Sequence, residues 1–177
     1  MKNIKTIMVT LAVLLGLALT LPSSTALETN ILIVKEVNLT VDIDPAFEAS
    51  NMSISEDNIQ FIVVENLEEP SAGNATIMVA TLITPEKPDP RVVSKFMENF
   101  MIGFFELTGD KEVGNFSVND SYGREVKVHT FSEKKPSTPS GRYDFASWYL
   151  DEWNYIFLAS SLNDTTKSII ETLSTVA

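Results

Sequence analysis

Apolar and polar residues alternate along three segments in the first half of the chain, as they do in strands that bury one face. The segments cover residues 31–43, 59–64 and 75–83. A proline follows the first and the third, and proline is rare inside a strand because it cannot donate a ladder hydrogen bond. Residues 46–57 are polar without a clear period. We therefore expect three strands, with 46–57 as an irregular connection.

A helical period follows. Asp89 can cap the free amides of a helix that starts at Pro90, and Gly109 suits the left-handed residue that ends one. Apolar residues recur every three to four positions between these signals: Val92, Val93, Phe96, Met97, Phe100, Met101, Phe104 and Phe105. This pattern predicts one helix whose aromatic stripe packs on a sheet.

Strand patterns return in the second half, over residues 115–118, 124–131, 143–150 and 153–160. The turn-forming residues 119–123 separate the first two, and a loop at 134–141 separates the next two. A last helix is predicted from Asn163, which we expect to be its N-cap, with Ile169, Ile170, Leu173 and Val176 on its inner face.

The predicted order is three strands, a helix, four strands and a helix. Consecutive hairpins favour an antiparallel sheet, so we expect an α+β fold with a mostly antiparallel sheet of six to seven strands covered by two helices. The closing hairpin, with Trp153-Asn154-Tyr155-Ile156-Phe157-Leu158, precedes a helical segment at 165–176. This order resembles the small Mog1/PsbP-type α/β sandwich domains. The resemblance implies a domain that binds or scaffolds partners, and it carries no functional residue over.

The N-terminus has the pattern of a secretory signal. Lys2 and Lys5 precede an apolar run at residues 7–21, and small residues stand at Ser24 and Ala26. The run is shorter than the ~20 residues of a membrane-spanning helix. We expect a signal peptide at residues 1–26 and a single domain at 27–177, in the secreted or cell-surface compartment. An uncleaved N-terminal segment, which would contact the membrane, is the alternative.

Charge and cysteine content narrow the function classes. The formal charge is −11, and loss of Lys2 and Lys5 with the signal makes it −13. The electric field of this negative charge repels the phosphate groups of nucleic acids, so we expect no nucleic-acid partner. The chain has no cysteine, so disulfides, thiolate metal sites and thiol nucleophiles are excluded.

Six positions read Asn-x-Ser/Thr, about three times the number that composition alone would give. They are Asn38, Asn51, Asn74, Asn115, Asn119 and Asn163. Around Asn38 and around Asn115 the acceptors alternate with apolar residues, which places them on the solvent side of a strand. We expect a glycoprotein. We expect an exported chain that carries glycans but has no cysteine to form disulfides, and this combination favours an archaeal cell surface.

Catalytic signatures are missing from the sequence. It has no HExxH motif, no phosphate-binding glycine loop and no GxSxG elbow. The single histidine, His129, lies in a strand pattern without a second histidine or cysteine nearby, so we expect a structural role for it. No catalytic residue, metal site or cofactor is predicted.

Two residue clusters remain as candidate contact surfaces. The first is aromatic and spans the closing hairpin: Tyr143, Phe145, Trp148, Tyr149, Trp153 and Tyr155. Its two apolar faces indicate either central strands covered on both sides or one open face that forms a groove for an apolar ligand or a protein partner. The second is basic, and either forms a solvated edge or contacts an anion or polysaccharide: Arg124, Lys127, Lys134, Lys135 and Arg142.

Together these patterns predict an extracytoplasmic, non-catalytic binding or interaction module at the cell surface. A small secreted hydrolase that uses carboxylates, or a structural component of the cell envelope, is the alternative. The sequence does not identify the protein or apolar ligand that such a module would bind.

Overall fold

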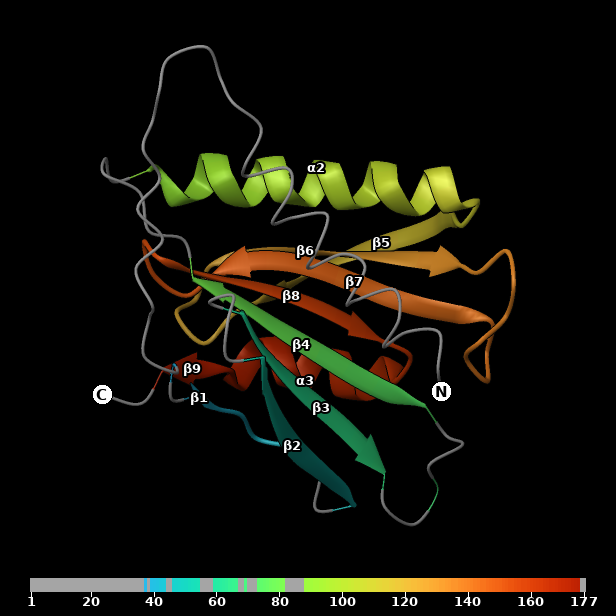
Figure 1. Ribbon diagram of the computed structural model, residues 1–177, viewed down its shortest axis with the longest axis horizontal. Coiled ribbons are helices and arrows are strands. Elements are labelled where there is room, and N and C mark those ends of the chain that lie inside the picture. Colours follow the sequence, from blue (N-terminus) through green and yellow to red (C-terminus); the bar gives the residue numbers. More distant parts are fainter. Residues whose placement is uncertain are drawn as a thin grey trace.

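The computed structural model describes residues 37, 39–43, 46–54, 59–66, 69, 73–81 and 88–175, without the side chains of 51–54 and 163–164. The predicted signal peptide and Asn38 lie outside the described residues. Within them the fold is α+β, as the sequence predicts, with a seven-stranded sheet and two helices (Figure 1).

Every neighbouring pair of strands in the main sheet is antiparallel, and the order across it is β2-β3-β4-β8-β7-β6-β5. Its strands are β2 (Phe47–Ile54), β3 (Ile59–Asn66), β4 (Asn74–Thr81), β5 (Lys111–Asn119), β6 (Glu125–Ser132), β7 (Arg142–Tyr149) and β8 (Asn154–Ser160). The closing hairpin β7–β8 lies in the middle, because β8 also pairs with β4. It therefore joins the two halves of the sequence into one sheet.

The start of the sheet differs from the sequence prediction. Residues 47–54, expected to be irregular, form the edge strand β2, which pairs with β3 along its whole length. Backbone hydrogen bonds hold an edge strand, so it needs no apolar alternation. Of the predicted strand 31–43, only β1 (Leu39–Thr40) is a strand among the described residues, and it pairs with β9 (Ser174–Thr175) in a separate two-stranded sheet.

Helix α2 (Pro90–Thr108) begins and ends where the sequence predicts. The carboxylate of Asp89 accepts a hydrogen bond from the amide of Arg91 at 2.9 Å, which satisfies one of the free N–H groups of the first turn. Gly109 closes the helix at φ 97°, and its amide donates to the carbonyls of Phe105 and Glu106. Only glycine adopts that left-handed conformation without strain.

The packing of α2 corrects the expected aromatic stripe. Met97, Met101 and Phe105 are buried against the sheet, whereas Phe96 is 60% exposed and Val92 is 66% exposed. The apolar arc of α2 is therefore wider than the side that meets the sheet, and the sequence period alone does not tell which part of such an arc is covered.

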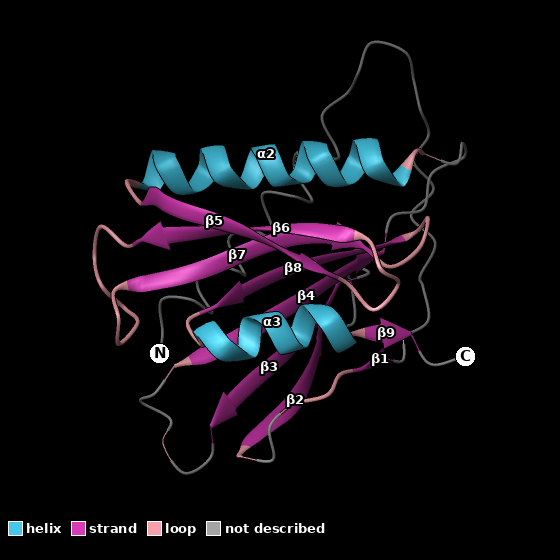
Figure 2. Cartoon of the chain, turned by 180° about the vertical axis from the view of Figure 1, so that it is seen from behind, coloured by secondary structure: helices cyan, strands magenta, loops and turns pink. Residues whose placement is uncertain are grey.

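Helix α3 (Asn163–Thr172) covers the opposite face of the sheet from α2 (Figure 2). Asn163 is its first helical residue, and Leu162 occupies the N-cap without a side-chain hydrogen bond. The expected capping role of Asn163 is therefore wrong. Ile169, Ile170 and Leu173 are fully buried, as their spacing predicts, and Val176 lies outside the described residues.

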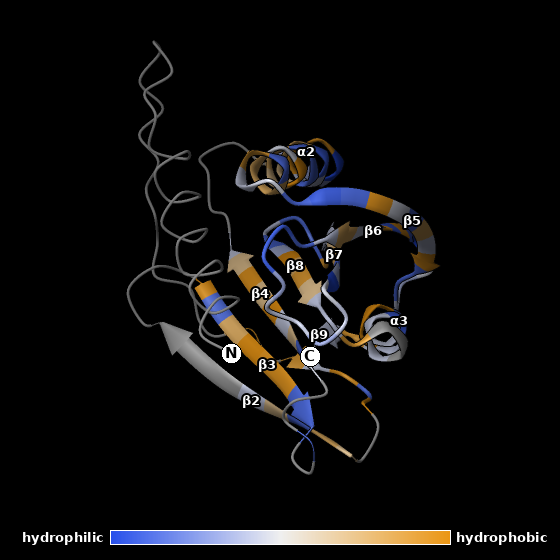
Figure 3. Ribbon diagram, turned by 90° about the vertical axis from the view of Figure 1, so that its right-hand side faces the viewer, coloured by the Kyte–Doolittle hydropathy of each residue, from blue (hydrophilic) through white to orange (hydrophobic). Residues whose placement is uncertain are grey.

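The sheet separates two apolar cores, one under each helix (Figure 3). Alternate residues of β7 and β8 enter both: Tyr155 and Phe157 face the α2 side, and Ile156 and Leu158 face the α3 side. Neither helix of the described chain is long and apolar enough to cross a membrane.

Candidate functional site

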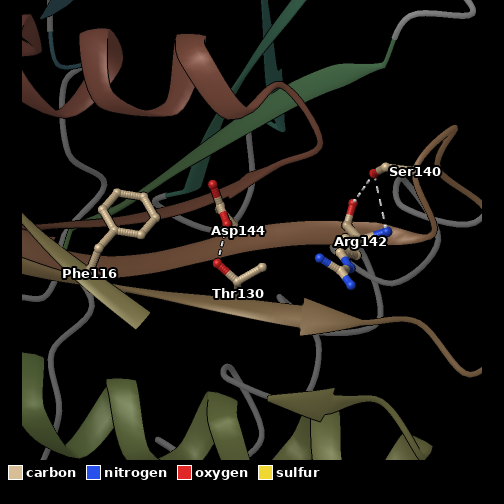
Figure 4. A pocket seen from close by; sticks show the side chains of 5 residues that line it. All are labelled: Phe116, Thr130, Ser140, Arg142 and Asp144. Atoms are coloured by element: carbon tan, nitrogen blue, oxygen red, sulfur yellow. Dashed lines mark hydrogen bonds between the residues drawn. The ribbon is translucent and has the colours of Figure 1, made fainter. Parts of the chain in front are cut away.

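A pocket of about 520 Å³ opens beside strands β5, β6 and β7 (Figure 4). Its lining residues are Phe116, Thr130, Ser140, Arg142 and Asp144. Asp144 alternates with Ala146 and Trp148, which belong to the core under α3, so the pocket lies on the α3 side of the sheet. The site thus combines a carboxyl, two hydroxyls, a guanidinium and an aromatic ring.

Asp144 is the chemically unusual group of the pocket. The residue is only 3% exposed, and the hydroxyl of Thr130 donates a hydrogen bond of 2.7 Å to its Oδ1 atom (Figure 4). Burial raises the pKa of the Asp144 carboxyl, and hydrogen bonds from Thr130 and Thr166 offset part of that effect. The carboxyl oxygens of Asp144 accept hydrogen bonds, which suits the binding of a hydroxyl-bearing ligand.

The loop between β6 and β7 holds the rim of the pocket. The hydroxyl of Ser140 donates to the carbonyl of Arg142 at 3.1 Å, which fixes the rim next to the first residue of β7. Glu133 organises the same loop by accepting four hydrogen bonds, from the amides and hydroxyls of Ser137 and Thr138. Burial raises the pKa of Glu133, but these hydrogen bonds outweigh it, and the net shift is downward. The rim is therefore a defined structure that can position Arg142.

The raised pKa of Asp144 has a consequence for stability. The folded state holds the proton of this carboxyl more tightly than the unfolded state, so stability falls as the pH rises from about 3.8 through the folded pKa. Asp144→Asn keeps the acceptor for Thr130 and removes the ionisation. We expect the variant to melt at a higher temperature than the wild type at pH 7, with the difference vanishing near pH 3.

Calorimetry across this pH range measures the effect, with Glu125→Gln, at an exposed carboxyl of β6, as the control. An Asp144→Asn variant that is less stable than the wild type at pH 7 would contradict the expectation that ionisation of Asp144 lowers the stability of the folded state.

The aromatic cluster does not form an open groove. Tyr143, Phe145, Trp148 and Tyr155 are buried, with Tyr155 only 2% exposed, and Tyr149 and Trp153 are half-buried. The structure therefore corrects the groove hypothesis. Strands β7 and β8 lie in the middle of the sheet with a helix on each side, so both of their faces are core.

The basic cluster divides into two groups. Arg124 and Lys127 lie near the start of β6, whereas Lys134, Lys135 and Arg142 lie beyond its far end. An eight-residue strand is about 26 Å long, so the five side chains do not make one patch. Arg142 alone among them lines the pocket.

Arg124 is committed to structural contacts. Its guanidinium forms an ion pair with Asp120 at 2.6 Å and donates to the carbonyl of Tyr149. It also lies over the rings of Tyr122 and Tyr149, at 4.8 and 4.3 Å from their centroids. Arg124 therefore braces the β5–β6 turn against β7, which corrects its assignment to an anion contact.

A buried charged cluster surrounds the single histidine. His129 is 2% exposed, its Nε2 atom lies 2.9 Å from Glu98 on α2, and its Nδ1 atom lies 2.9 Å from Glu112 on β5. Both ring nitrogens of His129 therefore have a carboxyl partner, one on a helix and one on a strand. The hydrogen bond from His129 is the main cause that lowers the pKa of Glu112. The cluster ties α2 to the sheet.

Lys95 completes this cluster, because its Nζ atom lies 3.0 Å from both carboxylate oxygens of Glu98. None of these side chains is among the lining residues of the pocket, and their contacts join α2 to β5 and β6.

The described glycosylation motifs lie on strands and at a helix start. Asn51 is in the edge strand β2, Asn74 begins β4, and Asn163 begins α3. Asn115 and Asn119 are exposed on the other edge strand, β5, as the alternation there predicts.

Of the five lining residues the sequence analysis singled out only Arg142, and it missed Phe116, Thr130, Ser140 and Asp144 as site residues. One signal was available for Asp144, which is the only charged residue in the apolar run 143–150. Within the residues the structure describes, no group of three or more histidine, aspartate or glutamate side chains could hold a metal ion. No protein-family model, curated protein or solved structure matches the chain.

Proposed function

We propose that the chain is an extracytoplasmic, N-glycosylated, non-catalytic binding module at the cell surface, and that the Asp144 pocket takes a small neutral ligand rich in hydroxyl groups, such as a saccharide. The observation that carries the proposal is the buried Asp144 carboxyl facing a pocket with an aromatic wall. The signal-like N-terminus and the six glycosylation motifs support the compartment.

The lining chemistry supports this ligand class. Sugar hydroxyls both donate and accept hydrogen bonds. The carboxyl of Asp144 and the hydroxyl oxygens of Thr130 and Ser140, whose protons are donated within the chain, offer acceptors. Arg142 supplies donors at the rim, and Phe116, which is 40% exposed, offers an apolar surface for the C–H face of a sugar ring. The formal charge of −11 opposes an anionic ligand.

A hydrolase is less well supported than a binding module. Glycoside hydrolysis uses a pair of carboxyl groups, one on each side of the scissile bond. Asp144 is the one carboxyl among the described lining residues of the pocket.

The test combines intact-mass measurement with ligand titration on the protein recovered from the exported fraction. We expect a mass that fits loss of residues 1–26 and added glycans, and binding of one or more neutral oligosaccharides from a panel followed by NMR. Asp144→Ala should weaken that binding about 10- to 100-fold, because a hydrogen bond that involves a charged group contributes about 1.5–3 kcal/mol.

Glu125→Gln again serves as the control, since its exposed carboxyl is not among the pocket residues, and it should bind as the wild type does. Full-length unmodified protein in the cytosol would contradict the compartment. Binding that is unchanged by Asp144→Ala, or cleavage of the oligosaccharide, would contradict the proposed site or its non-catalytic role.

A further inference from the structure

The side of α2 that does not meet the sheet carries an exposed apolar stripe. Val92 is 66%, Phe96 60% and Leu107 89% exposed. Successive residues of a helix are about 100° apart, so these three and Gly103 fall within an arc of about 60°. Phe100 borders the stripe and stacks on Phe96 with ring centroids 6.5 Å apart. Figure 3 views α2 nearly end-on and shows its separate apolar and polar sides.

The stripe is complementary to itself about a two-fold axis. For an axis between residues 99 and 100, Val92 of one helix faces Leu107 of an antiparallel copy, and Phe96 faces Gly103. A Cβ atom added to Gly103 would meet nothing within 4 Å in its own chain. The space over Gly103 is therefore open to a ring from outside, as packing of one helix's ridges into another's grooves requires.

Charges on the same helix favour the antiparallel arrangement. Lys95 has a side chain that is 61% exposed, and Glu106 is exposed on the same flank of the stripe. In an antiparallel pair Lys95 of each copy lies near Glu106 of the other. In a parallel two-fold pair the same flank of the two helices lies on opposite sides of the contact, so neither Lys95 nor Glu106 would meet its opposite charge there.

We propose that α2 docks antiparallel on α2 of a second copy of this chain to form a symmetric homodimer. A 19-residue helix is about 28 Å long, so this contact lies at the small end of specific interfaces and gives a weak dimer. The Asp144 pocket lies on the α3 side of the sheet, so it stays open in the dimer.

Sedimentation velocity of the full chain tests the proposal between about 1 and about 500 µM. We expect a monomer–dimer equilibrium in this range. Gly103→Leu should raise the dimer dissociation constant at least tenfold, because the side chain fills the space that the partner's Phe96 needs. The control is Gly114→Ala, at a second open position away from α2, which should leave the dimer unchanged.

A charge reversal on α2 and a lipid-binding measurement test whether the stripe on α2 is the face that forms the dimer. Glu106→Lys should weaken the dimer, since it replaces an attraction to the partner's Lys95 with a repulsion. Circular dichroism confirms that each variant is folded. The proposal is overturned by a monomer throughout the concentration range, or by a dimer that neither substitution weakens. A third outcome would also overturn the proposal: the monomer binds phosphatidylcholine vesicles and the Phe96→Asp variant does not. The stripe would then be a surface for lipid.

Discussion

Replacing His129 by leucine is expected to lower the free energy of unfolding by about 3 kcal/mol, since it removes the hydrogen-bond partner that two carboxyl groups share, one of them on the buried residue Glu98. Glu98 is 8% exposed and would keep only Lys95 as a partner. Glu112 would lose the hydrogen bond that lowers its pKa. Chemical denaturation at pH 6 measures the loss.

Two variants make this result specific. Lys127→Leu changes an exposed residue on the same strand and should alter stability by no more than about 0.5 kcal/mol. The double variant His129→Leu/Glu98→Leu should lose less than the sum of the single losses, because no buried carboxylate is left unpaired. A His129→Leu protein within 1 kcal/mol of the wild type, the energy of about one ordinary hydrogen bond, would show that the cluster does not hold α2 on the sheet.

Phe105→Ala is expected to cost about 3–5 kcal/mol, the range for loss of a buried aromatic side chain. Phe105 is 3% exposed, and its ring contacts those of Phe131, Tyr143 and Phe145 with centroids 5.1–5.4 Å apart. Truncation would leave a cavity under the C-terminal half of α2. Thermal and denaturant unfolding give the difference.

Phe96→Ala is the matched control, with the same substitution on the same helix at a residue that is 60% exposed. At low micromolar concentration, where the weak dimer is dissociated, we expect a change of at most about 0.5 kcal/mol. Equal losses for the two variants would mean that the two sides of α2 are buried to the same extent, contrary to the structure.

Local patterns in the sequence predicted the regular elements well. The cap at Asp89 and the left-handed Gly109 bound α2 as expected, because capping depends on the chemistry of one residue and its nearest amides. The two faces of the closing hairpin also follow from alternation. Strand β2 was missed, because its pairing with β3 supplies the stability that its own pattern does not suggest.

The amino-acid sequence by itself determined the order of the elements from β3 to α3, the α+β class and the exposed acceptors on β5, since each depends on local period or on a motif of three residues. Only the tertiary structure decided which sides of those elements are covered. It buried the aromatic hairpin between two helices, separated the basic residues along β6, and brought Glu98 and Glu112 to His129 across 31 and 17 residues of chain. The physical reason is that burial and ion pairing depend on contacts between distant segments, and no local period encodes them.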